Sequence, residues 1–254
     1  MNNLFGSILF VLILVSSSRL QAQTKPEAAV KKTFSPAIKG SPAAPGEPWK
    51  QLTTKERLVE ISTDFGVMVA KLYDSTPLHR DNFIRLTEGK FYDSLLFHRV
   101  ISQFMIQGGD PLSKNAASGV PLGSGSAPGD RVPAEFKTAF IHKKGALAAA
   151  RDNNPEKASS NCQFYIVQGK AMPGQELENV YNQRVKPANP AFSYTKSQKE
   201  IYTRIGGAPF LDQNYTVFGE VISGLDVIDK ISKVPKDASD RPVRDVRIKI
   251  RLLN

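Results

Sequence analysis

The spacing of apolar residues predicts strands at both ends of the region that carries regular structure. Residues 58–63 alternate apolar with polar side chains, and after a turn at 64–66 residues 67–72 form a second strand-like segment. Residues 246–252 alternate in the same way, with Arg and Lys at the polar positions. A two-residue period places successive side chains on opposite faces. We therefore expect the last segment to be a strand buried on one face, with a basic outer face.

Helical periodicity is limited to short segments. Thr76-Pro77 predicts a helix start, since threonine can cap a helix and proline is tolerated at its first position, and Gly89 predicts the end. A shorter helix is expected over 225–231. The run 146–150 favours helix by propensity, but it is short and turn residues follow it, so it is kept as a candidate strand. Many strands, few helices and frequent Gly and Pro turns predict a mainly β fold, a closed barrel with helices at its ends.

The N-terminal residues have the composition of an export signal. Residues 4–15 are apolar, but this run is too short for a bilayer span, which needs about 20 residues. Leu20-Gln21-Ala22 suits cleavage after Ala22, so residues 1–22 are interpreted as a cleaved signal peptide, with an uncleaved N-terminal anchor as the alternative. After cleavage no integral membrane span is expected. Prolines and basic residues predict a linker over 23–54, followed by one domain over 55–254.

Composition and charge narrow the classes of function. The chain has 254 residues, of which 41% are hydrophobic and 23% charged, as in an ordinary globular protein. A single cysteine excludes an internal disulfide and any zinc site built from several thiolates. The formal net charge is +10, but residues 58–229 contain 18 positive and 18 negative side chains. We predict no nucleic-acid partner, because such a partner requires a clustered basic face and conflicts with an export signal.

Three segments carry a resemblance to one enzyme family. Residues 97–110 read FHRVISQFMIQGGD, residues 162–166 read CQFYI, and Phe210-Leu211-Asp212 is followed by VFGEV at 217–221. The first segment resembles the signature of the cyclophilins, the peptidyl-prolyl cis-trans isomerases, and the others resemble further segments of that family. The resemblance covers about residues 58–254 apart from one insertion. It implies a closed eight-stranded antiparallel barrel capped by two helices. Together with the export signal, it implies an enzyme that assists folding of exported proteins in the bacterial periplasm.

The residue types in these segments suit rotation about an X-Pro peptide bond. Amide resonance sets a barrier of about 18–20 kcal/mol to this rotation. No covalent bond is broken, so neither a nucleophile nor a metal nor another cofactor is expected. A catalyst must hold the proline ring and favour the twisted amide over its planar forms. A guanidinium is rigid and permanently charged, and it can hydrogen-bond to the substrate carbonyl and to the prolyl nitrogen as resonance is lost.

The resemblance implies roles for specific residues. Arg99 would stabilise the twisted amide and Gln107 would orient it. Phe104 would be the third catalytic residue. Its ring would form part of an apolar pocket for the proline ring. The other predicted substrate-binding residues are Met105, Tyr165 and Leu211 in that pocket, Ala150 and Gln163 along the groove for the flanking peptide, and Phe210 and Tyr215.

The sequence departs from the best-known cyclophilin pattern at three of these positions. Phe210 stands in place of a tryptophan, which is expected to weaken binding of cyclosporin-type ligands. Tyr215 stands in place of a histidine at the groove rim. Tyr165 stands in place of a phenylalanine at the pocket wall, and its hydroxyl group needs a hydrogen-bond partner. The arginine chemistry itself is unaffected by these changes.

An insertion over 170–208 distinguishes this chain from many cyclophilins. Apolar residues at helical spacing occupy 177–185, and a capping-box pattern begins at Thr195. We interpret the insertion as two short helices joined by a Pro-rich loop at 186–193. Because the segment leads directly into Phe210-Leu211, we expect it to pack beside the proline pocket and to restrict or recruit substrates.

Other residues invite a chemical role but have a simpler structural interpretation. His98 could be a general base beside Arg99, but a buried structural histidine is favoured. His79 and His142 lack the spacing of a metal site, and Cys162 is expected to be a packed small residue rather than a reactive thiol. A peptide-binding chaperone with a cyclophilin fold and little catalysis stays open as the alternative function. For either function the expected partners are proline-containing unfolded or flexible polypeptides, and the expected oligomeric state is a monomer.

Overall fold

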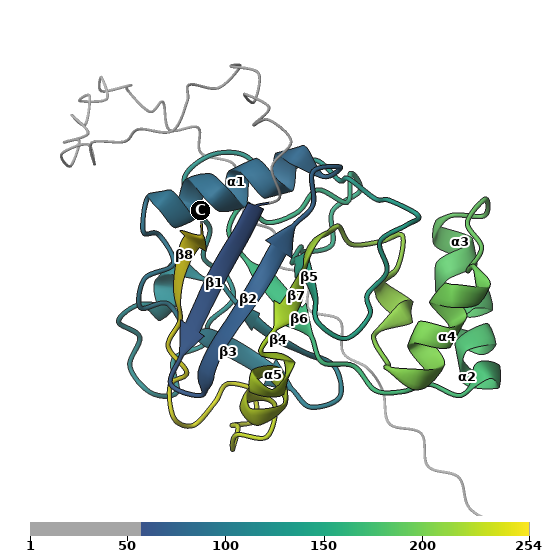
Figure 1. The fold of residues 1–254 in the computed structure, drawn as a ribbon. Coiled ribbons are helices and arrows are strands. Elements are labelled where there is room, and N and C mark those ends of the chain that lie inside the picture. The colour runs from purple at the N-terminus through teal and green to yellow at the C-terminus, as the bar shows by residue number, and fades with distance from the viewer. Residues whose placement is uncertain (1–56, 254) are drawn as a thin grey trace, which may run out of the picture. The chain divides into compact units, whose positions relative to one another are not determined.

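Eight antiparallel strands form a single sheet in the computed structural model, which describes residues 57–253 (Figure 1). The order of the strands across the sheet is β3-β4-β6-β5-β7-β2-β1-β8. This region is therefore mainly β, as the two-residue periodicity predicts. The strands are β1 (Arg57–Thr63), β2 (Gly66–Leu72), β3 (Phe97–Ile101), β4 (Met105–Gly108), β5 (Ala146–Ala149), β6 (Phe164–Val167), β7 (Val217–Ser223) and β8 (Lys249–Leu253).

The predicted N-terminal segments lie outside the described residues. Both the signal peptide at 1–22 and the linker at 23–54 precede residue 57, where the described region begins, so they stay predictions. The same holds for the predicted start of the domain at residue 55. Within residues 57–253, no helix has the length and apolar character needed to cross a membrane.

The sheet curls but is open, so the predicted closed barrel is not confirmed. β3 and β8 are the two edge strands, and no continuous ladder joins them within the described region. The segments that precede these strands make a short contact instead. Leu96 and Arg247 form an isolated bridge, and the amide of Phe97 donates to the carbonyl of Val246 at 2.9 Å. The contact stays short because β8 begins only at Lys249, and from there it pairs with β1.

Two helices lie at opposite ends of the sheet, α1 (Pro77–Glu88) and α5 (Leu225–Ile231) (Figure 1). Both agree with the helices that the sequence predicts. α1 begins at Pro77 and ends before Gly89, but the side chain of Thr76 makes no capping hydrogen bond.

The N-terminus of α1 is capped from a distant loop. The carboxylate of Glu135 accepts hydrogen bonds from the backbone amides of Leu78 at 3.1 Å and His79 at 3.0 Å. A negative charge at this end of a helix also interacts favourably with the helix dipole. The predicted threonine cap is therefore wrong, because a carboxylate remote in sequence satisfies the free amides of the first turn.

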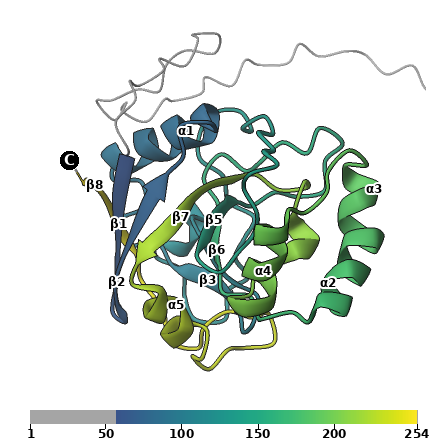
Figure 2. The same cartoon turned by 45° about the vertical axis from the view of Figure 1, so that its right-hand side comes forward.

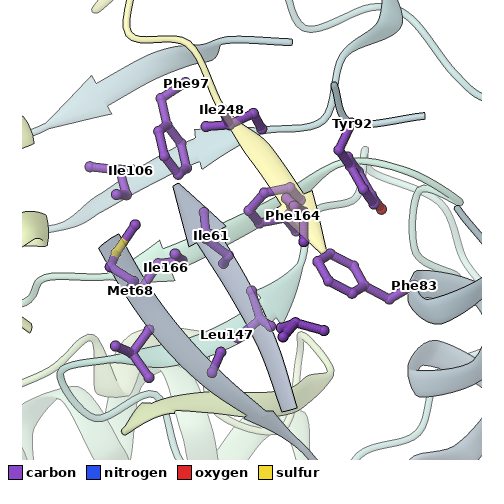
Figure 3. Packing of buried hydrophobic residues seen from close by; sticks show 14 of the residues in the cluster. Ile61, Met68, Phe83, Tyr92, Phe97, Ile106, Leu147, Phe164, Ile166 and Ile248 are labelled. Atoms are coloured by element: carbon purple, nitrogen blue, oxygen red, sulfur yellow. The ribbon is translucent and has the colours of Figure 1, made fainter. Parts of the chain in front are cut away.

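The main hydrophobic core lies between the sheet and the helices α1 and α5. Val59 and Ile61, at alternate positions of β1, are fully buried, as their period predicts. From α1, the ring of Phe83 lies 4.9 Å from that of Tyr92 and 5.4 Å from that of Phe164 on β6 (Figure 3). Burial of an apolar side chain of this size contributes about 1.5–3 kcal/mol, so these contacts hold α1 against the sheet.

The alanine-rich run at 146–150, for which the sequence leaves helix and strand open, forms the strand β5 (Ala146–Ala149). It lies in the interior of the sheet, paired with β6 on one side and β7 on the other, and all four of its residues are buried. Small side chains fit a strand that is covered on both faces, and pairing on both sides overrides the intrinsic helix propensity of alanine.

The insertion forms helices beside one end of the sheet (Figure 2). The capping box at Thr195 is confirmed, with both of its hydrogen bonds present. The predicted loop at 186–193 is partly wrong, because residues 186–188 continue the first helical segment directly after a π-helical turn. The helical segments are α2 (Gly174–Val180), a π-helical turn (Tyr181–Val185), α3 (Lys186–Ala188) and α4 (Lys196–Arg204).

The insertion has a hydrophobic cluster of its own. Leu177, Val185 and Tyr202 are buried in it to 1% exposure or less. Ile141, which precedes β5 in the body of the domain, belongs to the same cluster. The insertion is therefore packed against the body of the domain rather than extending from it.

Candidate active site

Antiparallel pairing brings the predicted site residues into one row across three strands. Arg99 on β3 lies directly opposite Gln107 on β4, and Gln107 lies directly opposite Tyr165 on β6. Directly opposed residues in antiparallel strands project from the same face of the sheet. The register therefore gathers a guanidinium and an amide from one hairpin with an aromatic ring from a strand much later in the chain.

These side chains line a cavity of about 440 Å³. Eight of the ten predicted site residues are in its wall, and the two others, Gln163 and Phe210, lie beside it. The eight are Arg99, Phe104, Met105, Gln107, Ala150, Tyr165, Leu211 and Tyr215.

Arg99 lies at the open side of this cavity. Its side chain is 44% exposed, and its Nε atom is 3.7 Å from the Asp240 carboxylate, which is longer than a hydrogen bond. A guanidinium held this loosely keeps donors that can reach a bound peptide.

Gln107 is tied to Gln163 rather than to Arg99. The Nε2 group of Gln107 donates to Oε1 of Gln163 at 3.0 Å. Gln163 in turn donates to the backbone carbonyls of Gly123 at 2.9 Å and Gly125 at 2.8 Å. Among residues 57–253, no side-chain hydrogen bond joins Gln107 to the Arg99 guanidinium, so the orienting role of Gln107 stays a prediction.

The apolar side of the cavity comes from β4, β6 and the turn before β7. Met105, Tyr165 and Leu211 belong to one buried cluster, against which Phe104 packs. Phe210 lies outside the cavity wall, 40% exposed, with its ring 5.2 Å from that of Phe104. It therefore supports the pocket wall through Phe104 and remains open to larger ligands.

Tyr215 and Arg151 form the rim. The ring of Tyr215 lies edge-on to Tyr165 at 6.2 Å, and the guanidinium of Arg151 lies 4.6 Å above the Tyr215 ring. Arg151 is also held by the carbonyl of Asn214, to which its Nε donates at 3.0 Å. A cation over an aromatic face is an attractive contact, so this rim is ordered by its own side chains.

A second hollow of about 920 Å³ continues from the first. Ala150 and Gln107 line both hollows, and Gln163 lines the second. At its edge, Arg131 and Asp152 form a bidentate ion pair with two contacts of 2.6 Å. Ala150 and Gln163 thus share this hollow, and their contact with a flanking peptide stays a prediction.

The hydroxyl group of Tyr165 has a partner that the sequence did not identify. It lies 3.0 Å from Nε2 of His142, whose Nδ1 is 2.7 Å from a carboxylate oxygen of Asp212. Both His142 and Asp212 are fully buried. The sequence indicated that Tyr165 needs a partner, but it gave no signal that the partner is a histidine paired with Asp212.

The remaining histidines and the cysteine are buried, as expected. Burial lowers the pKa of His98 to about 4, so its ring is neutral at neutral pH and a poor proton acceptor. His79 lies between Glu135 at 2.7 Å and Ser159 at 2.9 Å. Burial raises the pKa of the Cys162 thiol, which disfavours a reactive thiolate. In the part of the chain that the structure describes, no three metal-ligating side chains come together.

Comparisons with known proteins agree on one family. The family model described as "Cyclophilin type peptidyl-prolyl cis-trans isomerase/CLD" matches residues 58–251. A "Putative peptidyl-prolyl cis-trans isomerase" of Staphylococcus haemolyticus is 36% identical over 200 residues, which are 78% of this chain and 92% of that protein. A protein of the same description from Staphylococcus aureus is 34% identical over the same shares of both chains.

Solved structures show the same fold. A cyclophilin type peptidyl-prolyl cis-trans isomerase of Cryptosporidium parvum superposes with a TM-score of 0.56, at 21% identity, over 79% of this chain and 99% of that one. A second structure of that protein, in the presence of the dipeptide Ala-Pro, gives a TM-score of 0.54 at 22% identity. With the family model, the curated relatives and the site geometry in agreement, this chain belongs to the cyclophilin-type peptidyl-prolyl cis-trans isomerases.

Proposed function

We propose that the 440 Å³ cavity is the catalytic site of this isomerase, with Arg99 stabilising the twisted X-Pro amide. The observation that carries the proposal is the cross-strand row of Arg99, Gln107 and Tyr165. In this row a guanidinium that is 44% exposed stands beside the apolar side chains of the cavity. The proline ring occupies the pocket, and the carbonyl group of the residue before the proline rotates next to the guanidinium.

The chemistry needs no group beyond these side chains. The apolar wall formed by Phe104, Met105 and Leu211 holds the proline ring while the preceding residue turns. As resonance is lost, the prolyl nitrogen gains a lone pair and becomes a hydrogen-bond acceptor for the guanidinium. An interaction present only in the twisted state lowers the barrier, and each factor of ten in rate requires about 1.4 kcal/mol.

The substrates we propose are proline-containing, unfolded or flexible polypeptides. The second hollow, lined by Ala150 and Gln163, receives the residues that flank the X-Pro unit. Support comes from the solved relative studied in the presence of Ala-Pro, the dipeptide that matches such a unit. We further propose that the protein works as a monomer and binds cyclosporin-type ligands weakly, since Phe210 replaces a tryptophan.

The catalytic proposal is tested by removing the guanidinium. Arg99→Ala is expected to lower kcat/KM on an X-Pro peptide by about 100-fold, the effect of losing a hydrogen-bond donor made for the transition state. The rate is measured by NMR exchange or a protease-coupled assay. Arg251→Ala is the matched control, because Arg251 is an exposed arginine on β8 paired with Glu60. Full activity of Arg99→Ala would overturn the proposed mechanism.

We also propose that residues 1–22 direct export to the bacterial periplasm and are removed after Ala22. The support is the short apolar run at 4–15 followed by Leu20-Gln21-Ala22. The mass of the protein recovered from a periplasmic fraction is expected to correspond to a chain that begins at Gln23. A chain that keeps residues 1–22 in the membrane fraction would favour the uncleaved anchor.

A further inference from the structure

A buried chain of hydrogen bonds leads from the proline pocket into the insertion. The hydroxyl of Tyr165 contacts Nε2 of His142 at 3.0 Å, and Nδ1 of His142 contacts Oδ1 of Asp212 at 2.7 Å. The other oxygen of Asp212 accepts hydrogen bonds from the hydroxyls of Tyr194 and Tyr202, both at 2.6 Å. The five side chains are at most 8% exposed. We refer to them as the buried polar chain.

The direction of each hydrogen bond follows from the Asp212 carboxylate, which can only accept. Burial raises the pKa of Tyr165, Tyr194 and Tyr202 well above the usual value, so all three keep their hydrogen and can donate. Nδ1 of His142 therefore carries a hydrogen, and in the tautomer with its hydrogen on Nδ1, Nε2 is the acceptor for the Tyr165 hydroxyl. His142 thus donates to Asp212. Along the buried polar chain, each hydrogen bond is therefore donated in the direction of the Asp212 carboxylate.

The insertion supplies half of the donors to Asp212. Besides Nδ1 of His142, the backbone amide of His142 donates to Oδ1 at 2.8 Å, and Tyr194 and Tyr202 supply the two remaining hydrogen bonds. A fully buried carboxylate is costly unless its oxygens are hydrogen-bonded. The position of Asp212, and of the His142 ring that it holds, therefore depends on both insertion tyrosines.

Close packing reinforces this dependence. A Cβ atom at Gly207 would lie 2.6 Å from the Tyr202 ring and 2.3 Å from the carbonyl oxygen of His142, so only glycine fits between them. The amide of Ala208 also donates to the His142 carbonyl at 2.8 Å. The end of the insertion and the backbone of His142 are thus in direct contact, with little room for either to move independently.

We propose that Tyr194 and Tyr202 are positioning residues for the proline pocket. Acting through Asp212 and His142, they hold the Tyr165 hydroxyl and so fix the ring against which the substrate proline packs. This proposal rests on the pocket assignment made under Proposed function. It gives the insertion a role in the established reaction, in contrast to a separate docking surface. A ring held at one end is less free to rock, and a pocket that fits the twisted amide requires a fixed wall.

The proposal is tested by a double-mutant cycle on kcat/KM for an X-Pro peptide. Tyr202→Phe and Tyr194→Phe keep the rings and remove only the hydroxyl groups. Each is expected to lower kcat/KM by about three- to tenfold, the size typical of coupled neighbours. In a Tyr165→Phe background the same substitutions are expected to have no further effect, because the hydroxyl through which they act is already gone.

The matched control is Tyr181→Phe. Tyr181 packs against the same insertion cluster, but its hydroxyl donates to the carbonyl of Phe192 at 2.8 Å and does not contact Asp212. Its removal is expected to leave kcat/KM unchanged. The proposal is overturned if Tyr202→Phe and Tyr194→Phe leave kcat/KM unchanged, or if they lower it by the same factor with and without the Tyr165 hydroxyl. Arg99→Ala, measured in parallel, reports separately whether the pocket assignment is correct.

A readout independent of turnover comes from the histidine rings. The chain has three histidines, so ¹⁵N-labelled rings give a spectrum simple enough to assign with a His142→Asn variant. Nε2 of His142 is expected to show the shift of a hydrogen-bonded acceptor in the wild type and to lose it in Tyr165→Phe. Tyr202→Phe is expected to move the same resonance, whereas Tyr181→Phe is not. An unmoved Nε2 resonance in folded Tyr202→Phe would overturn the proposal.

Discussion

Tyr165 shows how a single substitution within a family pattern is accommodated. The sequence indicates that a tyrosine at this position needs a hydrogen-bond partner, and the structure supplies His142 at 3.0 Å. The partner could not be predicted, because His142 lies 23 residues before Tyr165 and Asp212 lies 70 residues after His142, so only the fold brings the three together. The ten site residues could be named because the family resemblance implies them residue by residue, although they lie in separate segments of the chain. The residues that hold one of them in place follow from the tertiary structure alone.

The exposed ring of Phe210 leads to a prediction about the affinity for cyclosporin. Its ring is 40% exposed and touches Phe104 at 5.2 Å, so a larger ring fits there without entering the core. Phe210→Trp is expected to tighten cyclosporin binding by about tenfold, because an indole adds apolar area and an N–H donor. Calorimetric titration measures the change in Kd. Ile222→Trp, at an exposed position of β7, is the control, and equal affinities in both variants would contradict the prediction.

Strands in which apolar and polar residues alternate could be predicted from the sequence. Elements whose type or end depends on tertiary contacts could not. β1, β2 and β8 follow the two-residue period because one face of each meets the core. β5 was ambiguous because its four residues are all buried, so no alternation exists to be seen. The predicted end of the first insertion helix is too early, since the helical backbone continues through a π-helical turn and Pro187 to Ala188. Closure of the sheet was overestimated because strand ends depend on pairing across the whole molecule.

The cap of α1 gives an element-scale prediction. Burial alone raises the pKa of Glu135, but hydrogen bonds from His79 and from two backbone amides outweigh it and hold the pKa below the usual 4.5. The stabilisation is therefore present above pH 4.5 and is lost as the pH falls through the folded-state pKa. Glu135→Gln is expected to lower the free energy of unfolding by about 1 kcal/mol at pH 7.

Urea denaturation at several pH values checks this prediction. The difference between wild type and Glu135→Gln is expected to shrink as the pH falls below 4.5, because the wild-type carboxylate then also gains a proton. Asp130→Asn serves as the control, since Asp130 is an exposed carboxylate that lies outside the helices. A difference that stays constant down to pH 3 would show that packing rather than charge sets the effect.

At the scale of the molecule, the site and the net charge are separate features. Residues 58–229 contain every proposed catalytic group and carry 18 positive and 18 negative side chains, while the chain as a whole is at +10. The excess positive charge therefore does not describe the catalytic cavity. The insertion, in contrast, is joined to the cavity by the buried polar chain and to the body of the domain through Ile141.

This connection predicts that the insertion and the body of the domain unfold together. Separating them would leave the buried carboxylate of Asp212 without two of its four hydrogen bonds, a loss of about 1–3 kcal/mol for each unsatisfied group. Hydrogen exchange is expected to give amides of α4 the same protection free energy as those of the central strands β5 and β6. In Asp212→Asn the charge that gathers these donors is absent, and exchange in α4 is expected to become faster than in β5. If α4 exchanges faster than β5 already in the wild type, the insertion opens independently and the carboxylate does not couple the two parts.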